Sequence, residues 1–160
     1  MMHNANHCDE MGAVPGATMQ PAFAIDLYRQ LSLPEGVLDD RADYIRQVRK
    51  GIPGSVVKGA IDLLGNRELF IRLLHTTSPN LSRFYKRKTL SPEDSEEVLD
   101  ALRIFVEAIR IWGDIDTART WLDTPLPALA GEKPVDLFDT FEGRRWIRQV
   151  LRRIECGEFS

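Results

Sequence analysis

SPEDSEEVLDALRIFVEAIRIWG, residues 91–113, is the segment that most strongly specifies the fold. It opens as a helix, because Ser91 is a capping residue, Pro92 suits a first helical turn and Asp94 stands at the acidic position of a capping box. Apolar side chains then recur at three- and four-residue spacing until Gly113 ends the helix. They are Val98, Leu99, Leu102, Phe105, Val106, Ile109 and Trp112. The segment predicts a helix of about five turns that forms the spine of the protein.

Shorter helical patterns lie on both sides of this spine. The upstream patterns cover residues 23–31, 40–51, 53–65, 67–75 and 79–88. The second of them is expected to bury Ala42, Ile45 and Val48. Downstream, Asp116 is expected to cap a short helix, and Thr140 to open a last helix that ends before Gly157. No segment alternates with the period of a strand, so the predicted fold class is all-α.

The same patterns predict the domain organisation. Residues 1–20 lack periodicity and form a loose leader, residues 21–90 form a helical region, and residues 91–160 form a second helical domain with a short tail. Hydrophobic residues make up 43% and charged residues 28% of the 160, as in soluble globular proteins. With no membrane span of about 18 apolar residues and no signal peptide, we expect a cytoplasmic protein with no membrane partner.

Basic residues concentrate in one short segment although the net charge of the chain is −3. Between Arg67 and Lys88 there are six basic residues and one acid, Glu68. A short helix, a turn and a second helix with a basic end are typical of a helix-turn-helix, here over about residues 66–88. The candidate DNA-binding residues are Ser78, Asn80, Ser82, Arg83, Lys86, Arg87 and Lys88. A plain helical hairpin with a solvated basic face is an equally good interpretation of this spacing.

Five arginines mark the last predicted helix: Arg144, Arg145, Arg148, Arg152 and Arg153. They are expected to lie opposite an apolar face formed by Trp146, Ile147, Val150, Leu151 and Ile154. Such a stripe is usually solvated, yet arginine is enriched at protein interfaces together with aromatic anchors. Phe159 in the tail is a candidate anchor, and a frayed chain end is the alternative.

The sequence offers no pattern of an enzyme. A nucleophile paired with a base, paired acids, a glycine-rich phosphate loop and a metal-binding cluster are all missing, and the cysteines match no metal spacing. We therefore predict no catalytic residues, no metal site and no cofactor.

Residues 112–160, WGDIDTARTWLDTPLPALAGEKPVDLFDTFEGRRWIRQVLRRIECGEFS, closely resemble the C-terminal toxin-binding domain of Xre/MbcA/ParS antitoxins. The shared pattern is a GD, A..WL.TP, PAL.G..P.DL and a tail of the R.IE.G.FS kind. Residues 63–96, LLGNRELFIRLLHTTSPNLSRFYKRKTLSPEDSE, resemble the Xre-like helix-turn-helix of these antitoxins, so the likeness covers roughly residues 50–160.

The resemblance implies a function without catalysis. Members of this family bind a RES-domain toxin that destroys NAD and occlude its pocket, and their helix-turn-helix acts on their own operator. The resemblance also implies that the tail residues of the R.IE.G.FS pattern lie at the toxin pocket: Arg153, Glu155, Gly157, Phe159 and Ser160. With the arginine stripe and the rest of the tail, the candidate toxin-binding residues are Arg148, Arg152, Arg153, Glu155, Gly157, Glu158, Phe159 and Ser160. The expected partners are a RES-domain toxin, operator DNA and a second copy of this chain within a toxin–antitoxin hetero-oligomer.

The rival interpretation is a stand-alone DNA-binding transcriptional regulator whose C-terminal domain dimerises. A toxic neighbouring gene discriminates between the two, as does deletion of the tail ECGEFS, which leaves a regulator active and weakens an antitoxin. An enzyme is the third possibility, and a turnover assay on the purified chain tests it.

Overall fold

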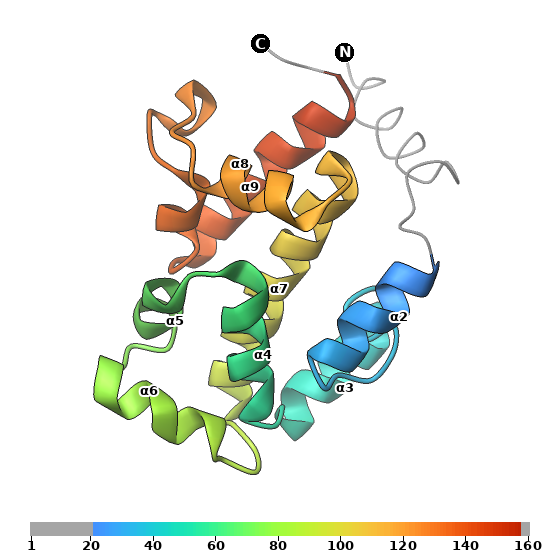
Figure 1. The fold of residues 1–160 in the computed structure, drawn as a ribbon, viewed down its shortest axis with the longest axis vertical. Coiled ribbons are helices and arrows are strands. Elements are labelled where there is room, and N and C mark those ends of the chain that lie inside the picture. The colour runs from blue at the N-terminus through green and yellow to red at the C-terminus, as the bar shows by residue number, and fades with distance from the viewer. Residues whose placement is uncertain (1–20, 158–160) are drawn as a thin grey trace. The chain divides into compact units, whose positions relative to one another are not determined.

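The computed structural model describes residues 21–157, and within that range every regular element is a helix (Figure 1). The all-α prediction is confirmed. The predicted leader, residues 1–20, and the tail residues Glu158, Phe159 and Ser160 lie outside the described residues. No described helix combines the length and the apolar character that a membrane span requires.

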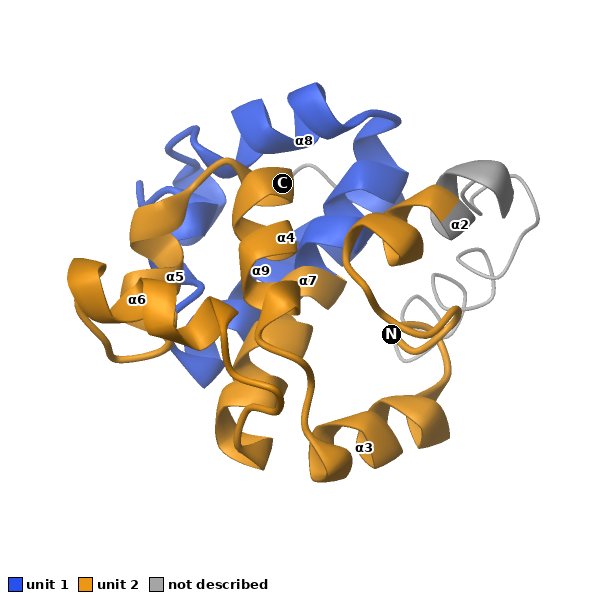
Figure 2. Cartoon of the chain, turned by 60° about the horizontal axis from the view of Figure 1, so that its bottom comes forward, with its two compact units in different colours: residues 1–20, 104–160 blue, residues 21–103 orange. Residues whose placement is uncertain are grey.

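Within the described residues the chain divides into two compact units, which are residues 21–103 (unit 2 in Figure 2) and residues 104–157 (unit 1). The division falls inside the long helix α7, Pro92–Trp112. This helix begins and ends as predicted, since the Ser91 hydroxyl accepts a hydrogen bond from the Asp94 amide at 3.1 Å and Gly113 follows with a φ of +89°. The domain boundary near residue 91 stays a prediction from the sequence.

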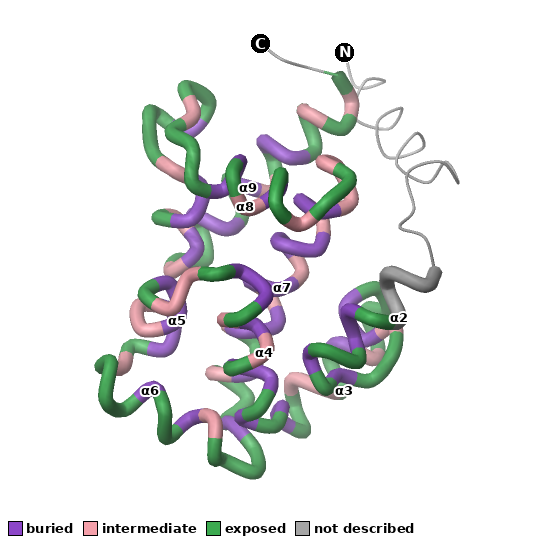
Figure 3. Tube along the Cα trace, viewed as in Figure 1, coloured by how far each residue is buried: buried purple, intermediate pink, exposed green. Residues whose placement is uncertain are grey.

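Unit 2 holds α2 to α6 and the first half of α7. Their bounds are α2 Pro21–Gln30, α3 Arg41–Lys50, α4 Ser55–Leu64, α5 Arg67–Leu73 and α6 Ser78–Tyr85. Helices α4, α5 and α6 pack pairwise on one another, and their fully buried side chains include Val57, Phe70 and Leu81. Buried and exposed positions alternate along these helices, as Figure 3 shows. Asn66 caps α5 as predicted, accepting from the Leu69 amide at 3.0 Å.

The prediction for the buried face of α3 is wrong. Ala42 is exposed and Ile45 is 41% exposed, whereas Tyr44, which the pattern omitted, is only 7% exposed. The guanidinium of Arg103 lies over the Tyr44 ring, 4.3 Å from its centroid. Burial raises the pKa of Tyr44 to about 12, with Asp100 as a further cause. The buried sector of α3 is therefore turned toward Tyr44, whose ring has a cation on its face, and away from Ala42 and Ile45.

Unit 1 consists of the rest of α7, α8 Ile115–Leu122, the 3-10 turns η2 Pro127–Leu129 and η3 Pro134–Leu137, and α9 Phe141–Glu155. Helix α9 packs on η2 and η3, and η3 also packs on α8. The core of this unit includes Phe105, Ile109, Leu129, Phe138, Ile147 and Leu151. The cap of α8 is Asp114 and not the predicted Asp116, because the Asp114 carboxylate accepts from the Thr117 amide at 2.7 Å.

The start of α9 is held tightly against η3. Thr140 caps it as predicted and accepts from the Gly143 amide at 3.0 Å. A Cβ at Gly143 would lie 2.0 Å from the carbonyl oxygen of Leu137, so this position has no room for a side chain. Arg144 is 2% exposed and donates through Nη1 to the Phe138 carbonyl at 2.7 Å.

Two predictions for α9 are therefore wrong. Arg144 belongs to the core and not to the solvated arginine stripe. Trp146 was expected in the core and is 37% exposed. The predicted core positions Ile147, Val150 and Leu151 are confirmed as buried, and Gly143 joins them. The apolar sector is rotated toward Gly143 and Arg144 because only a glycine allows the helix to approach the η3 backbone this closely.

Candidate functional site

The outer face of α9 carries the described part of the candidate toxin-binding residues. Arg152, Arg153 and Glu155 are exposed, and Arg148 is half-buried. Gly157 is exposed and has a φ of +75°, a left-handed conformation that ends the helix. The tail residues that follow lie outside the described residues, so their place in the site stays a prediction.

The arginines of α9 do not all face the same way. Neighbouring helical positions are about 100° apart, so Arg152 and Arg153 diverge, while Arg148 and Arg152, one turn apart, share a side. Arg148 and Arg152 act electrostatically on Glu107 of α7, as do Arg110 and Glu155. The site thus has two parts, a charged cluster shared by α7 and α9, and a more exposed ridge that includes Arg153.

Glu107 is half-buried in the charged cluster, and its pKa is raised. Burial is the main cause and Glu155 adds to it, whereas Arg148, Arg110 and Arg152 oppose it. The desolvation of this carboxylate outweighs the attraction of three guanidinium groups. Ionised Glu107 is therefore less stable in this cluster than in water, because it loses solvation there.

We expect the stability of this protein to fall as the pH rises from the ordinary carboxyl range through the pKa of native Glu107. A raised pKa means that the native state binds this proton more readily than the unfolded chain, so ionisation favours unfolding. Glu107→Gln should remove that part of the pH dependence. Urea unfolding across a pH series measures it, with exposed Glu132→Gln as the control. Equal pH profiles for wild type and Glu107→Gln would contradict the expectation.

Two exposed aromatic residues on α9 belong to the candidate site and were missed by the sequence reasoning. Phe141 is 70% exposed and Trp146 is 37% exposed. Trp146 and Arg153 are seven residues apart and therefore lie on one side of the helix, two turns from each other. Exposed aromatic residues beside arginines are the composition of interface hot spots. Gly143 could have indicated the exposure of Trp146. If the buried side of α9 is centred near this glycine, Trp146 points away from the core.

The candidate DNA-binding residues lie on α6 and in the loop after it. Ser78, Asn80, Ser82 and Arg83 are exposed on α6. The predicted helix ran to Lys88, but α6 ends at Tyr85. Lys86, Arg87 and Lys88 are therefore exposed loop residues and not the last turn of a recognition helix. The prediction for the helix end is wrong because the chain turns there to run along the start of α4, where the Gly54 amide donates to the Arg87 carbonyl at 2.9 Å.

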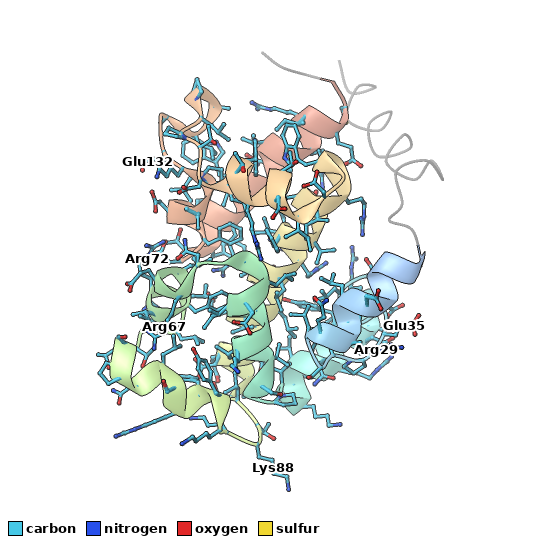
Figure 4. The ribbon with its side chains drawn as sticks, viewed as in Figure 1. Arg29, Glu35, Arg67, Arg72, Lys88 and Glu132 are labelled. Carbon is cyan, nitrogen blue, oxygen red and sulfur yellow. The ribbon has the colours of Figure 1, made fainter. Side chains whose placement is uncertain are left out.

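Arg67 fixes the start of α6 relative to α5. Its guanidinium donates to the Ser78 hydroxyl at 2.5 Å and to the Ser78 carbonyl at 2.8 Å. Thr77 occupies the N-cap position of α6 without a capping hydrogen bond from its side chain. Figure 4 labels Arg67 on α5 and Lys88 on the loop that follows α6. The packing of α5 and α6 across the short turn His75–Thr77 is compatible with a helix-turn-helix, which stays a prediction.

Within residues 21–157, no group of three or more His, Cys, Asp and Glu side chains is arranged to hold a metal ion. The chemistry of both candidate sites is that of binding through arginine, lysine, carboxylate and aromatic groups.

Comparison with known proteins places these sites in context. Residues 107–157 match the model of the antitoxin Xre/MbcA/ParS C-terminal toxin-binding domain. Over 129 residues the chain is 31% identical to the Prs ADP-ribosylating antitoxin of Sphingobium sp. (strain YBL2), a match covering 74% of this chain and 81% of that protein. Over 71 residues it is 32% identical to Antitoxin Xre of Yersinia enterocolitica serotype O:8 / biotype 1B (strain NCTC 13174 / 8081), covering 44% and 48% of the two chains.

Proposed function

Because this chain belongs to the Xre/MbcA/ParS family of antitoxins, we propose that it neutralises a RES-domain toxin by occluding the pocket in which that toxin degrades NAD. The chain is an antitoxin of a toxin–antitoxin system, and its partner is a cognate toxin. The proposal assigns the chain no catalysis of its own, and it places the pair in the cytoplasm, where NAD is available.

The observation that carries the proposal is the outer face of α9 within the matched domain. This face offers Arg153 and Trp146 as exposed groups, and it leads through Gly157 into the tail. A guanidinium forms paired hydrogen bonds to carboxylates or phosphates, and a tryptophan supplies buried apolar area. A pocket that binds NAD must accept phosphate groups, so the carboxylate of Glu155 can take the place of a phosphate, whereas Arg153 can pair with acidic groups of the toxin.

An ADP-ribosylating toxin is the second candidate partner, and the relative from Sphingobium favours it. The name of that antitoxin refers to ADP-ribosylation of Prs. ADP-ribosylation transfers the ADP-ribose part of NAD to a protein and releases nicotinamide. Both candidate partners therefore consume NAD, and occlusion of an NAD pocket serves against either one.

The decisive experiment is expression of the adjacent toxin gene alone and together with variants of this chain. We expect the toxin to lower intracellular NAD and stop growth, and the full chain to restore both. Trp146→Ala and Arg153→Glu should each weaken the complex about tenfold to a hundredfold, because loss of a hot-spot side chain costs about 1–3 kcal/mol. Calorimetry on the purified pair measures this affinity, and deletion of residues 156–160 should weaken it further.

The control is Arg41→Glu, which changes an exposed arginine of α3 in the other unit. It should bind the toxin like wild type. If the neighbouring protein is harmless, or if none of the α9 variants changes its inhibition, the antitoxin mechanism fails and the stand-alone regulator becomes the better interpretation. ADP-ribose found on a cellular protein, with little general loss of NAD, would replace the RES-domain toxin by the second candidate.

We further propose that the chain represses its own operon as a dimer, using α5 and α6 as a helix-turn-helix. The exposed polar residues Ser78, Asn80 and Ser82 and the basic Arg83 support this proposal, because these residue types read base edges and phosphates. Two copies of one chain match the two-fold symmetry of an operator, and this also favours a dimer within the toxin complex.

A further inference from the structure

Two segments that are far apart in the sequence run side by side in unit 2. The Leu90 amide donates to the Ile52 carbonyl at 2.8 Å, and the Gly54 amide donates to the Arg87 carbonyl at 2.9 Å. A Cβ at Gly51 would lie 2.4 Å from the Leu90 carbonyl oxygen and 2.5 Å from the Thr89 methyl group. The end of α3 is therefore pressed against the loop that follows α6.

This contact brings together basic residues of separate origin. Arg49 and Lys50 form the last turn of α3, directly before Gly51. Lys86, Arg87 and Lys88 lie in the loop, directly before Thr89. All five side chains are exposed, and Lys88 extends away from the ribbon in Figure 4. We call this set of five residues the basic patch.

The basic patch lacks acidic partners among the described residues. No described ion pair involves any of its five members, whereas Arg46 on the same helix pairs with Asp43. Arg87 makes a different contact, since its guanidinium lies over the Phe84 ring, 4.1 Å from the centroid. This contact orients a cation without neutralising it. Arg49 and Lys50 are favourable at the C-terminus of α3, because this end of the helix dipole is negative. The dipole does not explain why three further cations lie beside them.

We propose that the basic patch is one phosphate-binding surface for the backbone of duplex DNA. The inference rests on the proposed operator binding and adds α3 to it, a helix that lies outside the predicted helix-turn-helix. Duplex DNA is the favoured occupant because α6, which ends at the patch, exposes the base-reading types Ser78, Asn80 and Ser82. Of α3, α6 and the loop, only α3 exposes a large apolar side chain, Ile45, and one such side chain is too little apolar surface for insertion into a membrane.

In this proposal the basic patch contacts the phosphates, and α6 contacts the bases. Contacts to phosphates position a protein on DNA and are independent of sequence, while contacts to bases select the site. Loss of patch residues should therefore weaken binding to any duplex equally. It should also lower the salt dependence of binding, by about 0.9 in the log–log slope for each phosphate contact that is lost.

The test uses the full-length chain and measures fluorescence anisotropy of two duplexes, the region upstream of its gene and an unrelated sequence, between about 50 and 200 mM salt. The variant Arg49→Gln/Lys50→Gln should bind both duplexes at least about tenfold more weakly, with a slope smaller by about 2. Arg41→Gln/Arg46→Gln, which removes two exposed arginines of α3 outside the patch, is the matched control and should change affinity by less than about twofold. Circular dichroism verifies that each variant is folded.

The outcomes separate this inference from the operator proposal. If Lys86→Gln/Lys88→Gln weakens binding but Arg49→Gln/Lys50→Gln leaves affinity and slope unchanged, α3 is no part of the surface and the inference fails, while operator binding stands. If wild type binds neither duplex, both fail. An RNA duplex is added as a third probe, and tighter binding to it than to either DNA duplex overturns DNA as the occupant.

Discussion

Gly143→Ala is expected to lower the free energy of unfolding by about 3 kcal/mol, the upper part of the range for overpacking a filled core. A Cβ at this position would overlap the Leu137 carbonyl oxygen at 2.0 Å and the Thr140 hydroxyl at 2.7 Å. The first obstacle is backbone, which cannot rotate away as a side-chain end can. Helix propensity by itself predicts the opposite sign, since alanine in place of a helical glycine stabilises by about 0.5–1 kcal/mol.

Gly131→Ala is the matched control for this prediction. Gly131 has a φ of +84°, and a Cβ added there would have nothing within 4 Å, so alanine meets only backbone strain, about 1–2 kcal/mol. Urea unfolding of both variants measures the two losses. A Gly143→Ala protein as stable as wild type would show that α9 does not lie this close to η3. Because the packing of α9 on η3 positions the helix whose outer face is the proposed toxin-binding site, we also expect Gly143→Ala to weaken toxin binding.

Arg144→Met is expected to lower the free energy of unfolding by about 2–3 kcal/mol. Arg144 is 2% exposed and donates to the Phe138 carbonyl at 2.7 Å, so methionine leaves that buried oxygen without this donor. A hydrogen bond from a charged group contributes about 1.5–3 kcal/mol, and an unsatisfied buried acceptor carries a further desolvation penalty. The aliphatic part of the side chain is largely preserved, which isolates the loss of the guanidinium.

The neighbouring Arg145 supplies the control. Its side chain is 62% exposed, with an ion pair to Glu142 at 3.9 Å, so Arg145→Met should change stability by no more than about 0.5 kcal/mol. Thermal and urea unfolding of the two variants give the comparison. Equal effects of the two substitutions would contradict the assignment of Arg144 to the core. A loss of toxin affinity in a fully stable Arg144→Met protein would return Arg144 to the interface.

The boundaries of most helices were predictable because their signals are local. Asp40, Asn66, Ser91 and Thr140 each cap the helix that follows through a side-chain oxygen three residues before the amide that donates. Such caps are set by a few consecutive residues and need no distant partner. The end of α6 at Tyr85 was not predictable, because the chain leaves the helix there to bond with the distant Gly54.

The buried face of a helix was less predictable than its length. In α3 the apolar spacing selected Ile45, yet Tyr44 is the buried residue, with Arg103 of α7 over its ring. In α9 the spacing selected Trp146, yet Gly143 and Arg144 face the core. A strongly amphipathic pattern shows roughly which side of a helix is buried. The neighbouring elements then decide which residues on that side face the core.

Some residues of the candidate sites were also predictable from the sequence, and others were not. The arginines of the C-terminal helix and the basic residues after residue 78 were recognised by their type and their place in the family motifs. Glu107, which lies among Arg148, Arg152 and Glu155, was not, and neither were Arg49 and Lys50 beside the loop Lys86–Lys88. These groupings join residues separated by about forty positions, which no local pattern records.

Local sequence signals were enough to establish that this protein is all-α, where most of its helices begin and end, and that it belongs to an antitoxin family. Capping residues, helix stops and family motifs involve few consecutive residues, and they act the same way in any surroundings. The burial of Arg144, the exposure of Trp146 and the position of α3 beside the basic loop emerged only from the folded structure. Close packing sets these outcomes, because the space and the hydrogen-bond partners at each position come from segments distant in the chain.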